Sequence, residues 1–284
     1  MCVDLHTHSL YSDGSHSPRE LVDMALKNRL SCLALTDHDT VEGVPELLRL
    51  GREAGLAVIG GVEISTCFRG LTVHVLGYGV DPDLPGLHDW LRPLQNGRAD
   101  RNRRILENLA VLGIPISPEE LAAEAGEGQC GRPHIAKILV RRGVVATTDE
   151  AFDRYLARDK PAWAPRFSYE SPEAIAMIHS AGGRAVLAHP GVLGLDQDGL
   201  ADVFQELTRA GLDGVEVWYP SHGKPFRALL LDLARRLGLL VTGGSDFHGA
   251  TRPAHPMAKT GCSFCPPDDI LPPLLAVLDK SPRS

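Results

Sequence analysis

Short apolar runs alternate with amphipathic segments through the first eighty residues. The apolar runs have the length of strands and cover 1–5, 31–36, 56–64 and 71–78. Two segments between these runs have helical periodicity. The first begins at Ser17-Pro18-Arg19-Glu20, which offers an N-cap, a proline and an acidic first turn, and the second covers 43–54. Strand, helix, strand, helix, strand within about sixty residues predicts parallel strands joined by right-handed crossovers.

The alternation stops near Asp81 and resumes near Arg166. Between them only helical periodicity is visible, over 84–112, after Ser117-Pro118, and over 133–142 and 147–157. Afterwards helices at 171–181, 198–210 and 224–237 alternate with strands at 184–188, 214–218 and 239–242. We therefore predict one α/β barrel or sheet formed by residues 1–80 and 167–284, with residues 81–166 as an inserted helical subdomain over the active site.

Polar side chains gather where the predicted strands end. They are His6 and His8, Asp37 and His38, Glu63, His189, and Asp246 with His248. In parallel α/β folds this edge is where sites assemble, because strands fix the backbone while the following loops present side chains. His6 and His8 share one face of their strand, and a nearby carboxylate such as Asp13 would complete a divalent metal site.

Composition and charge narrow the class of protein. The chain has 284 residues, 43% of them hydrophobic, enough for a large core, and no apolar run of membrane-spanning length. Its start lacks the pattern of a secretory signal, so we expect a cytoplasmic protein whose six cysteines are reduced, with Cys262-x-x-Cys265 a loop carrying two thiols. The net charge is −7, but residues 84–166 hold 13 Lys and Arg against 11 Asp and Glu, a mildly basic part that could hold an anionic substrate.

The motifs together resemble the PHP (polymerase and histidinol phosphatase) family. The resemblance covers the whole chain, including the place of the insertion, and is nearest to the bacterial subgroup that acts on AMP and nucleoside 3′,5′-bisphosphates, related to a 5′→3′ exoribonuclease. It rests on Asp4-Leu5-His6-Thr7-His8, Ser12-Asp13-Gly14, Leu35-Thr36-Asp37-His38-Asp39, Gly61-Val62-Glu63-Ile64-Ser65, His74-Val75-Leu76-Gly77, Ala188-His189-Pro190 and Gly244-Ser245-Asp246-Phe247-His248.

The resemblance implies a distorted barrel of about seven strands that binds two or three divalent metals. The implied ligands are His6, His8, Glu63 and Asp246 for the first metal, Asp13, His38 and His248 for the second, and Glu63, His74 and His189 for the third. Imidazole and carboxylate without thiolate suit Mn²⁺, Zn²⁺ or Fe²⁺. Relatives often have His where Asp13 stands, and the harder oxygen ligand favours Mn²⁺. Asp37 and Asp39 are expected to orient neighbouring ligands.

Substrate contacts are expected outside the metal ligands. Arg132 and His134 at the start of an insertion helix, and Lys160, match positions where similar proteins hold substrate phosphate. His222 follows the strand 214–218; it is a candidate acid for the leaving oxygen or a phosphate contact, and a plain loop histidine is the alternative. Asp13, through the second metal, and His222 are thus the catalytic candidates.

The implied function is hydrolysis of a phosphate ester on a small nucleotide. The first candidate substrate is a nucleoside 3′,5′-bisphosphate, which would lose its 3′-phosphate, and the second is AMP. The metals would lower the pKa of a water, orient the phosphoryl group and stabilise the leaving oxygen. The alternatives are 5′→3′ exonucleolytic cleavage of short RNA, histidinol phosphatase activity, and a non-catalytic metal- or nucleotide-binding module, although every expected ligand is present. We expect neither a membrane partner nor an obligate protein partner.

Overall fold

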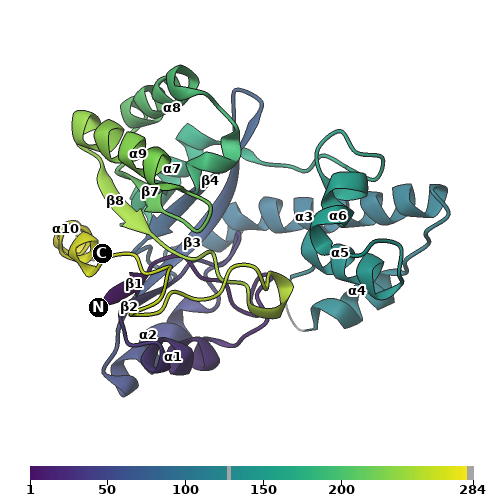
Figure 1. Cartoon of the computed structure of the whole chain (residues 1–284), viewed down its shortest axis with the longest axis horizontal. Coiled ribbons are helices and arrows are strands. Elements are labelled where there is room, and N and C mark those ends of the chain that lie inside the picture. Colours follow the sequence, from purple (N-terminus) through teal and green to yellow (C-terminus); the bar gives the residue numbers. More distant parts are fainter. Residues whose placement is uncertain (127–128, 280–284) are drawn as a thin grey trace.

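A computed structural model of the protein describes residues 1–126 and 129–279 (Figure 1). The strands are β1 (Cys2–Asp4), β2 (Leu30–Leu35), β3 (Ala57–Phe68), β4 (Leu71–Tyr78), β5 (Tyr169–Glu170), β6 (Arg184–Leu187), β7 (Gly214–Trp218) and β8 (Leu240–Gly243). The helices are α1 (Pro18–Lys27), α2 (Val44–Ala54), α3 (Leu87–Val111), α4 (Pro118–Ala125), α5 (Arg132–Arg141), α6 (Thr148–Ala151), α7 (Ser171–Ser180), α8 (Gln197–Arg209), α9 (Lys224–Leu237) and α10 (Leu271–Leu278). A π-helical turn, Phe152–Leu156, continues α6.

The strands form the predicted distorted barrel. Their order is β1-β2-β3-β4-β6-β7-β8, and β5 pairs with β3 outside this path. β1, β2 and β3 are parallel, as are β6, β7 and β8, whereas β4 runs antiparallel to both of its neighbours. The two ends of the path meet where Leu5 N–H donates to Gly243 O at 3.1 Å and His8 N–H donates to Phe247 O at 2.9 Å. The predicted α/β barrel is confirmed.

The boundary predicted for β3 is wrong. The strand continues past residue 64 to Phe68 and pairs with β4 along its second half, from Gly61 opposite Tyr78 to Phe68 opposite Leu71. Arg69 and Gly70 connect the two strands with left-handed φ values of 51° and 76°, as a two-residue hairpin turn requires. Glu63 therefore lies inside a strand and not at its end. Residues 65–67 pair antiparallel with residues 72–74 of β4.

Helices cover the barrel on its outer faces and at one end. α1 begins at the expected N-cap, and Ser17 and Glu20 form a capping box in which each caps the other's backbone. α1 and α2 pack together over β2, and α7, α8 and α9 cover the side formed by β4, β6 and β7. α10 contributes Leu271 and Leu274 to the apolar group beneath β1 and β6. No helix in the described part of the chain is both long enough and apolar enough to cross a membrane.

The helices from α3 to α6 project from the barrel (Figure 1). α3 joins two hydrophobic clusters, because Leu91 and Leu94 belong to the barrel core while Ile105 and Leu109 belong to a second core shared with α4, α5 and the turn after α6. Arg98 and Arg101 lie on α3 between these anchors and are buried. The limits 81 and 166 of a separate inserted subdomain stay a prediction, and residues 127 and 128 within them lie outside the described part.

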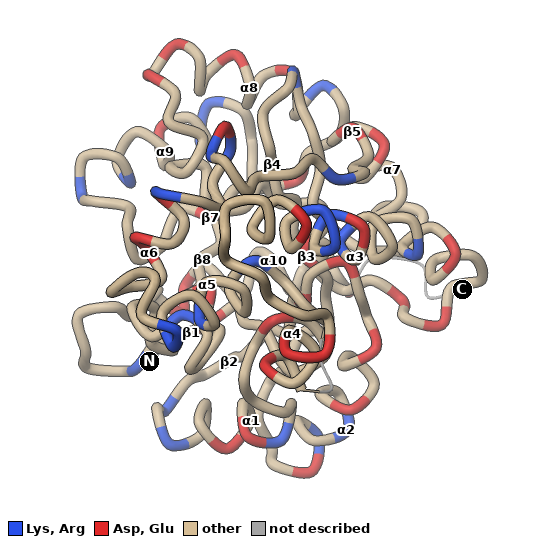
Figure 2. The backbone as a smooth tube through the Cα atoms, turned by 90° about the vertical axis from the view of Figure 1, so that its right-hand side faces the viewer, with Lys and Arg blue, Asp and Glu red and all other residues tan. Residues whose placement is uncertain are grey.

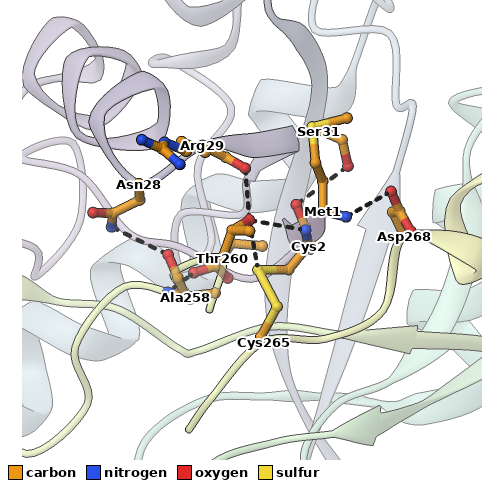
Figure 3. Close-up of a disulfide and its surroundings, with 10 residues drawn as sticks. Met1, Cys2, Asn28, Arg29, Ser31, Ala258, Thr260, Cys265 and Asp268 are labelled. Carbon is orange, nitrogen blue, oxygen red and sulfur yellow. Dashed lines mark hydrogen bonds and ion pairs between the residues drawn. A yellow bond between two sulfur atoms is a disulfide. The ribbon is translucent and has the colours of Figure 1, made fainter. Parts of the chain in front are cut away.

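Cys2 and Cys265 form a disulfide, so the expectation of reduced thiols is wrong for this pair (Figure 3). Their Cα atoms are 5.3 Å apart although 263 positions separate them in the sequence. The loop is further held by Thr260, whose hydroxyl accepts from Cys2 N–H and donates to Arg29 O, and by Asn28, whose amide donates to Ala258 O. The remaining cysteines, Cys32, Cys67, Cys130 and Cys262, are free. The pairing depends on barrel closure, which local spacing does not indicate.

We expect Cys265→Ser to lower the free energy of unfolding by about 3 to 5 kcal/mol, because the disulfide closes nearly the whole chain into one loop. Chemical denaturation without reductant measures this difference. Cys262→Ser is the matched control, since Cys262 is exposed and unpaired. Equal stability of Cys265→Ser and the wild type would contradict a stabilising disulfide.

Candidate metal centre

The barrel brings eight of the nine predicted ligands into three contiguous clusters. Within each cluster, one ligand atom per residue lies within 4.8 Å of every other. The clusters are His6, His8, Glu63 and Asp246; His8, Asp13, His38 and His248; and His38, Glu63 and His74. The first matches the predicted set. The second adds His8 to the predicted set, and the third contains His38 in place of His189.

Glu63 stands at the centre of these clusters and is fully buried. Its Oε2 lies 3.2 Å from His6 Nε2, 3.2 Å from His8 Nε2 and 3.0 Å from His38 Nδ1. Its Oε1 lies 2.7 Å from His74 Nδ1 and 2.9 Å from His189 Nε2. One carboxylate thus faces five imidazoles, three at Oε2 and two at Oε1. Because its two oxygens face different imidazoles, it can bridge two cations.

Several atoms of these clusters are buried without a hydrogen-bond partner among the described residues. They are His6 Nε2, His8 Nε2, Asp13 Oδ1, His38 Nδ1 and Glu63 Oε2. Buried polar atoms in proteins are nearly always hydrogen-bonded, so five unsatisfied atoms facing one another need another partner. Imidazole nitrogens and carboxylate oxygens are ligand types for divalent transition metals. The arrangement therefore fits bound metal ions.

Buried partners outside the clusters fix the ligand orientations. Glu216 Oε1 lies 3.0 Å from His6 Nδ1, and Glu216 Oε2 accepts from His189 N–H at 2.8 Å. His6 Nδ1 therefore carries the proton and Nε2 is left as the metal-binding atom. His248 is held in the same way, because its Nδ1 lies 2.8 Å from Asp246 O while its Nε2 faces Asp13 Oδ1 at 3.2 Å.

Three residues in or next to the clusters have left-handed backbone conformations. φ is 57° at Asp39, 29° at His189 and 54° at Asp246. Such conformations cost free energy in residues other than glycine and persist only when the surroundings impose them. Here the Asp39 N–H donates to Glu63 O at 3.0 Å, and Glu216 holds His189. The strain is thus concentrated where strands turn to present side chains to the centre.

The neighbouring imidazoles favour the charged form of the carboxylates at the centre. Burial alone would raise the pKa of Glu63, but His38, His6 and His74 lower the pKa well below its usual value. Burial likewise opposes ionisation of Asp13, yet His38 and His248 hold its pKa well below normal. Carboxylates that are ionised near neutral pH are ready to bind cations.

A cavity of about 490 Å³ adjoins the clusters, and it is also lined by a group of arginines and by Asp149 and Asp153. The ligands Asp13, His38, Glu63, His74, His189, Asp246 and His248 line it, together with Arg98, Arg101, Arg132, Arg166 and Arg252. Asp39 anchors two of these arginines, with its Oδ2 2.9 Å from Arg98 and 3.2 Å from Arg166. Burial raises the pKa of Asp39, but the two guanidiniums outweigh it and lower that pKa to about 2.

Arg101 has no such counter-charge. It is 5% exposed, its Nε has no hydrogen-bond partner, and no carboxylate oxygen among the described residues lies within ion-pair distance of it. Burial, and then the nearby Arg166, Arg132 and Arg98, lower its pKa well below the usual value. An unpaired buried guanidinium is costly, and an anion in the cavity would relieve that cost.

The residues predicted to bind substrate lie in different surroundings. Arg132 lines the cavity and its Nη1 donates to Leu156 O at 3.2 Å. His134 is buried, and its Nδ1 accepts from Gly131 N–H at the start of α5. Lys160 is exposed and does not line the cavity. Of these three predicted substrate contacts, the structure places Arg132 in the lining of the cavity.

His222, the predicted acid, lies beneath the loop that follows His189. Both of its ring nitrogens are used by the backbone, Nε2 accepting from Gly191 N–H at 3.2 Å and Nδ1 lying 3.0 Å from Val217 O. It is buried and does not line the cavity. These contacts suit a residue that holds the loop, and a catalytic role for His222 stays an untested prediction.

Sequence reasoning missed Arg98, Arg101, Arg166 and Arg252. A signal existed for the first two, because they recur with helical spacing between apolar residues of α3 and so occupy its buried face. Arg252 pairs with Asp246 Oδ2, which also accepts from Tyr219 Oη at 2.9 Å. Asp37, expected to orient ligands, instead accepts from Ser9 N–H and from the hydroxyls of Ser9 and Ser12, fixing the loop that carries Asp13.

Known proteins resemble this chain in sequence and in structure. Residues 4–112 match the PHP domain. The 5′-3′ exoribonuclease Rnm of Salmonella typhimurium is 37% identical over 86% of this chain and 84% of its own length. The 3′,5′-nucleoside bisphosphate phosphatase of Chromobacterium violaceum is 33% identical over 87% of each chain.

A Bifidobacterium adolescentis protein assigned as a metal-dependent phosphoesterase has a similar structure. The TM-score is 0.85 at 33% identity, with 97% of this chain and 96% of the other covered. Both the sequence relatives and this structure extend over the barrel and the helical region. The likeness in sequence, fold and clustered ligands shows that the chain belongs to the PHP family of metal-dependent phosphoesterases.

Proposed function

We propose that this phosphoesterase removes the 3′-phosphate from nucleoside 3′,5′-bisphosphates. The observation that carries the proposal is one cavity with two walls of opposite chemistry, the metal-ligand clusters on one side and the arginines around the unpaired Arg101 on the other. A substrate with two phosphates can place one at each wall. The activity for which the relative from Chromobacterium violaceum is named supports this choice.

The chain's own residues would divide the work as follows. We assign the metals to His6, His8, Glu63 and Asp246, to Asp13, His38 and His248, and to Glu63, His74 and His189. Divalent metals held there supply Lewis acidity and an activated water. Arg101, Arg98 and Arg166 would bind the phosphate that is not cleaved, since guanidinium groups bind phosphate through paired hydrogen bonds. Arg132 would extend this wall, whereas we assign His134 and His222 to holding their loops.

The same two anions occur at the end of an RNA chain, which makes 5′→3′ exonucleolysis the second candidate. A 5′-phosphorylated RNA presents a terminal phosphate and, one nucleotide away, a 3′-phosphodiester. The relative from Salmonella typhimurium is named for that activity. Figure 2 shows acidic and basic positions interspersed on the face that carries α3 to α6, so we expect short oligonucleotides and not long RNA to bind.

Phosphate or nucleotide release with Mn²⁺ separates these candidates. We expect adenosine 3′,5′-bisphosphate to react with the highest kcat/KM, followed by a short 5′-phosphorylated RNA, with AMP and histidinol phosphate slower. Faster release from histidinol phosphate would overturn the proposal. Absence of release from all four would favour a metal- or nucleotide-binding module.

We propose Mn²⁺ as the physiological metal, with Zn²⁺ or Fe²⁺ as alternatives. Asp13 contributes an oxygen ligand between His38 and His248, and oxygen ligands favour Mn²⁺ over the softer metals. Elemental analysis of protein purified from its native cells measures this directly. A preparation that contains zinc alone would contradict the assignment.

A further inference from the structure

A second cavity of about 380 Å³ lies on the other side of Arg98. Arg98 lines both cavities, so the second one adjoins the arginine wall of the first. Tyr11, Glu42, Gln95 and Asn102 also line it. A ligand whose phosphate lies at the arginine wall can therefore place its remaining part in the second cavity.

Asn102 provides an unused hydrogen-bond acceptor in this cavity. The residue is 4% exposed; its Nδ2 donates to Cys130 O at 2.8 Å, while its Oδ1 is buried without a partner among the described residues. An unsatisfied buried carbonyl is costly, and a bound donor would relieve that cost. Gln95 is similar, because its Nε2 donates to Asp39 O at 3.0 Å and its Oε1 is left as an acceptor.

Tyr11 provides an aromatic face that is held in place. An added Cβ at Gly43 would lie 2.9 Å from Tyr11 Cδ2, so the ring packs closely against the backbone there. The Tyr11 hydroxyl donates to Glu46 Oε2 at 3.4 Å, and the side chain is half-buried. A ring fixed at one edge of a polar cavity is suited to stack on a flat heterocycle.

We propose that this second cavity is a nucleobase subsite. The base would stack on Tyr11 and donate from an exocyclic amine to Asn102 Oδ1, while Arg98 holds the adjoining phosphate. Since Asn102, Gln95 and Glu42 all present acceptors, the subsite favours bases that carry an amine. The inference rests on the proposed function and extends it from the two phosphates to the base attached to the same ribose.

The test compares substrates that differ only in the base. We expect the wild type to hydrolyse adenosine 3′,5′-bisphosphate with about tenfold or higher kcat/KM than 1-O-methylribose 3,5-bisphosphate, which has no base. Purine riboside 3′,5′-bisphosphate, which lacks the amine, should fall between them. Equal kcat/KM for all three would overturn the subsite and leave the phosphatase function standing; no hydrolysis of any would instead overturn the function.

Variants assign the effect to the cavity. Tyr11→Ala should lower kcat/KM about tenfold for the adenosine substrate and leave the base-free substrate unchanged, and Tyr11→Phe should retain the wild-type values. Asn102→Ala should remove the preference for adenosine over purine riboside. Asn96→Ala is the matched control, because Asn96 is exposed on the same helix. Equal losses on both kinds of substrate would show a general defect and contradict the proposal.

Binding of adenosine itself tests the subsite without turnover. Titration calorimetry should detect adenosine binding to the wild type and to Tyr11→Phe but not to Tyr11→Ala. Identical affinities of Tyr11→Ala and the wild type would overturn stacking on Tyr11, whatever the enzyme hydrolyses.

Discussion

Replacing Glu63 with glutamine is expected to lower kcat/KM about a thousandfold or more and to reduce the metal content of the protein. Glutamine preserves the size of the side chain but removes the charge that faces five imidazoles. A neutral amide also presents an N–H₂ group to part of the cluster, where it would repel a cation. Both the first and third proposed metal sites depend on this residue, so its loss should affect more than one ion.

Elemental analysis after dialysis, together with kcat/KM at saturating Mn²⁺, measures the effect. Glu53→Gln makes the same chemical change on the exposed surface of α2 and should leave metal content and turnover unchanged. Glu63→Gln protein with wild-type metal content and activity would contradict a bridging role. A folded variant, shown by an unchanged circular dichroism spectrum, separates this loss from unfolding.

Replacing Arg101 with methionine is expected to raise stability while lowering activity on the bisphosphate about a hundredfold. Removing a buried guanidinium that lacks a counter-charge should stabilise the free protein by about 1 to 2 kcal/mol. The same change removes a contact to the phosphate that is not cleaved, so the loss should appear in KM more than in kcat. Small aryl phosphates, which have only the reacting group, should be hydrolysed at nearly the wild-type rate.

Arg104→Met is the matched control for Arg101, because Arg104 is exposed on the same helix. Inorganic phosphate should raise the melting temperature of the wild type and of Arg104→Met, and raise that of Arg101→Met less. Loss of stability in Arg101→Met, or equal losses on the bisphosphate and on aryl phosphates, would contradict the assignment of Arg101 to phosphate binding.

The ligands of the centre were predictable because they lie in short motifs beside strands. His6 and His8, or Asp246 and His248, are close in the sequence, and each pair follows the end of a strand, β1 or β8, at the centre. Glu63 was correctly grouped with them, although its position inside β3 was not expected. Its neighbours on β4 and on the loop after β6 come together only when β4 inserts antiparallel between parallel strands, an arrangement that local patterns do not specify.

Helical spacing could have indicated that Arg98 and Arg101 are buried, but sequence patterns could not indicate the assembly of the arginine wall or the disulfide. Arg101 and Arg166 are separated in the sequence by three helices, α4, α5 and α6, so no local pattern brings them together. Cys2 and Cys265 meet because the first and last strands of the barrel are neighbours. Such contacts follow from closure of the whole fold, whereas motifs report only residues that are near one another along the chain.

One face of α3 carries the groups that we propose bind the substrate, and their separation from the metal ligands has an evolutionary consequence. Leu91 and Leu94 fix the helix to the barrel, Ile105 fixes it to the second core, and Arg98, Arg101 and Asn102 lie between these anchors. The strands and their following loops, by contrast, hold the metal ligands. Single substitutions along this face can therefore alter which nucleotide is accepted while the hydrolytic machinery is inherited unchanged, a route by which related enzymes could acquire new substrates.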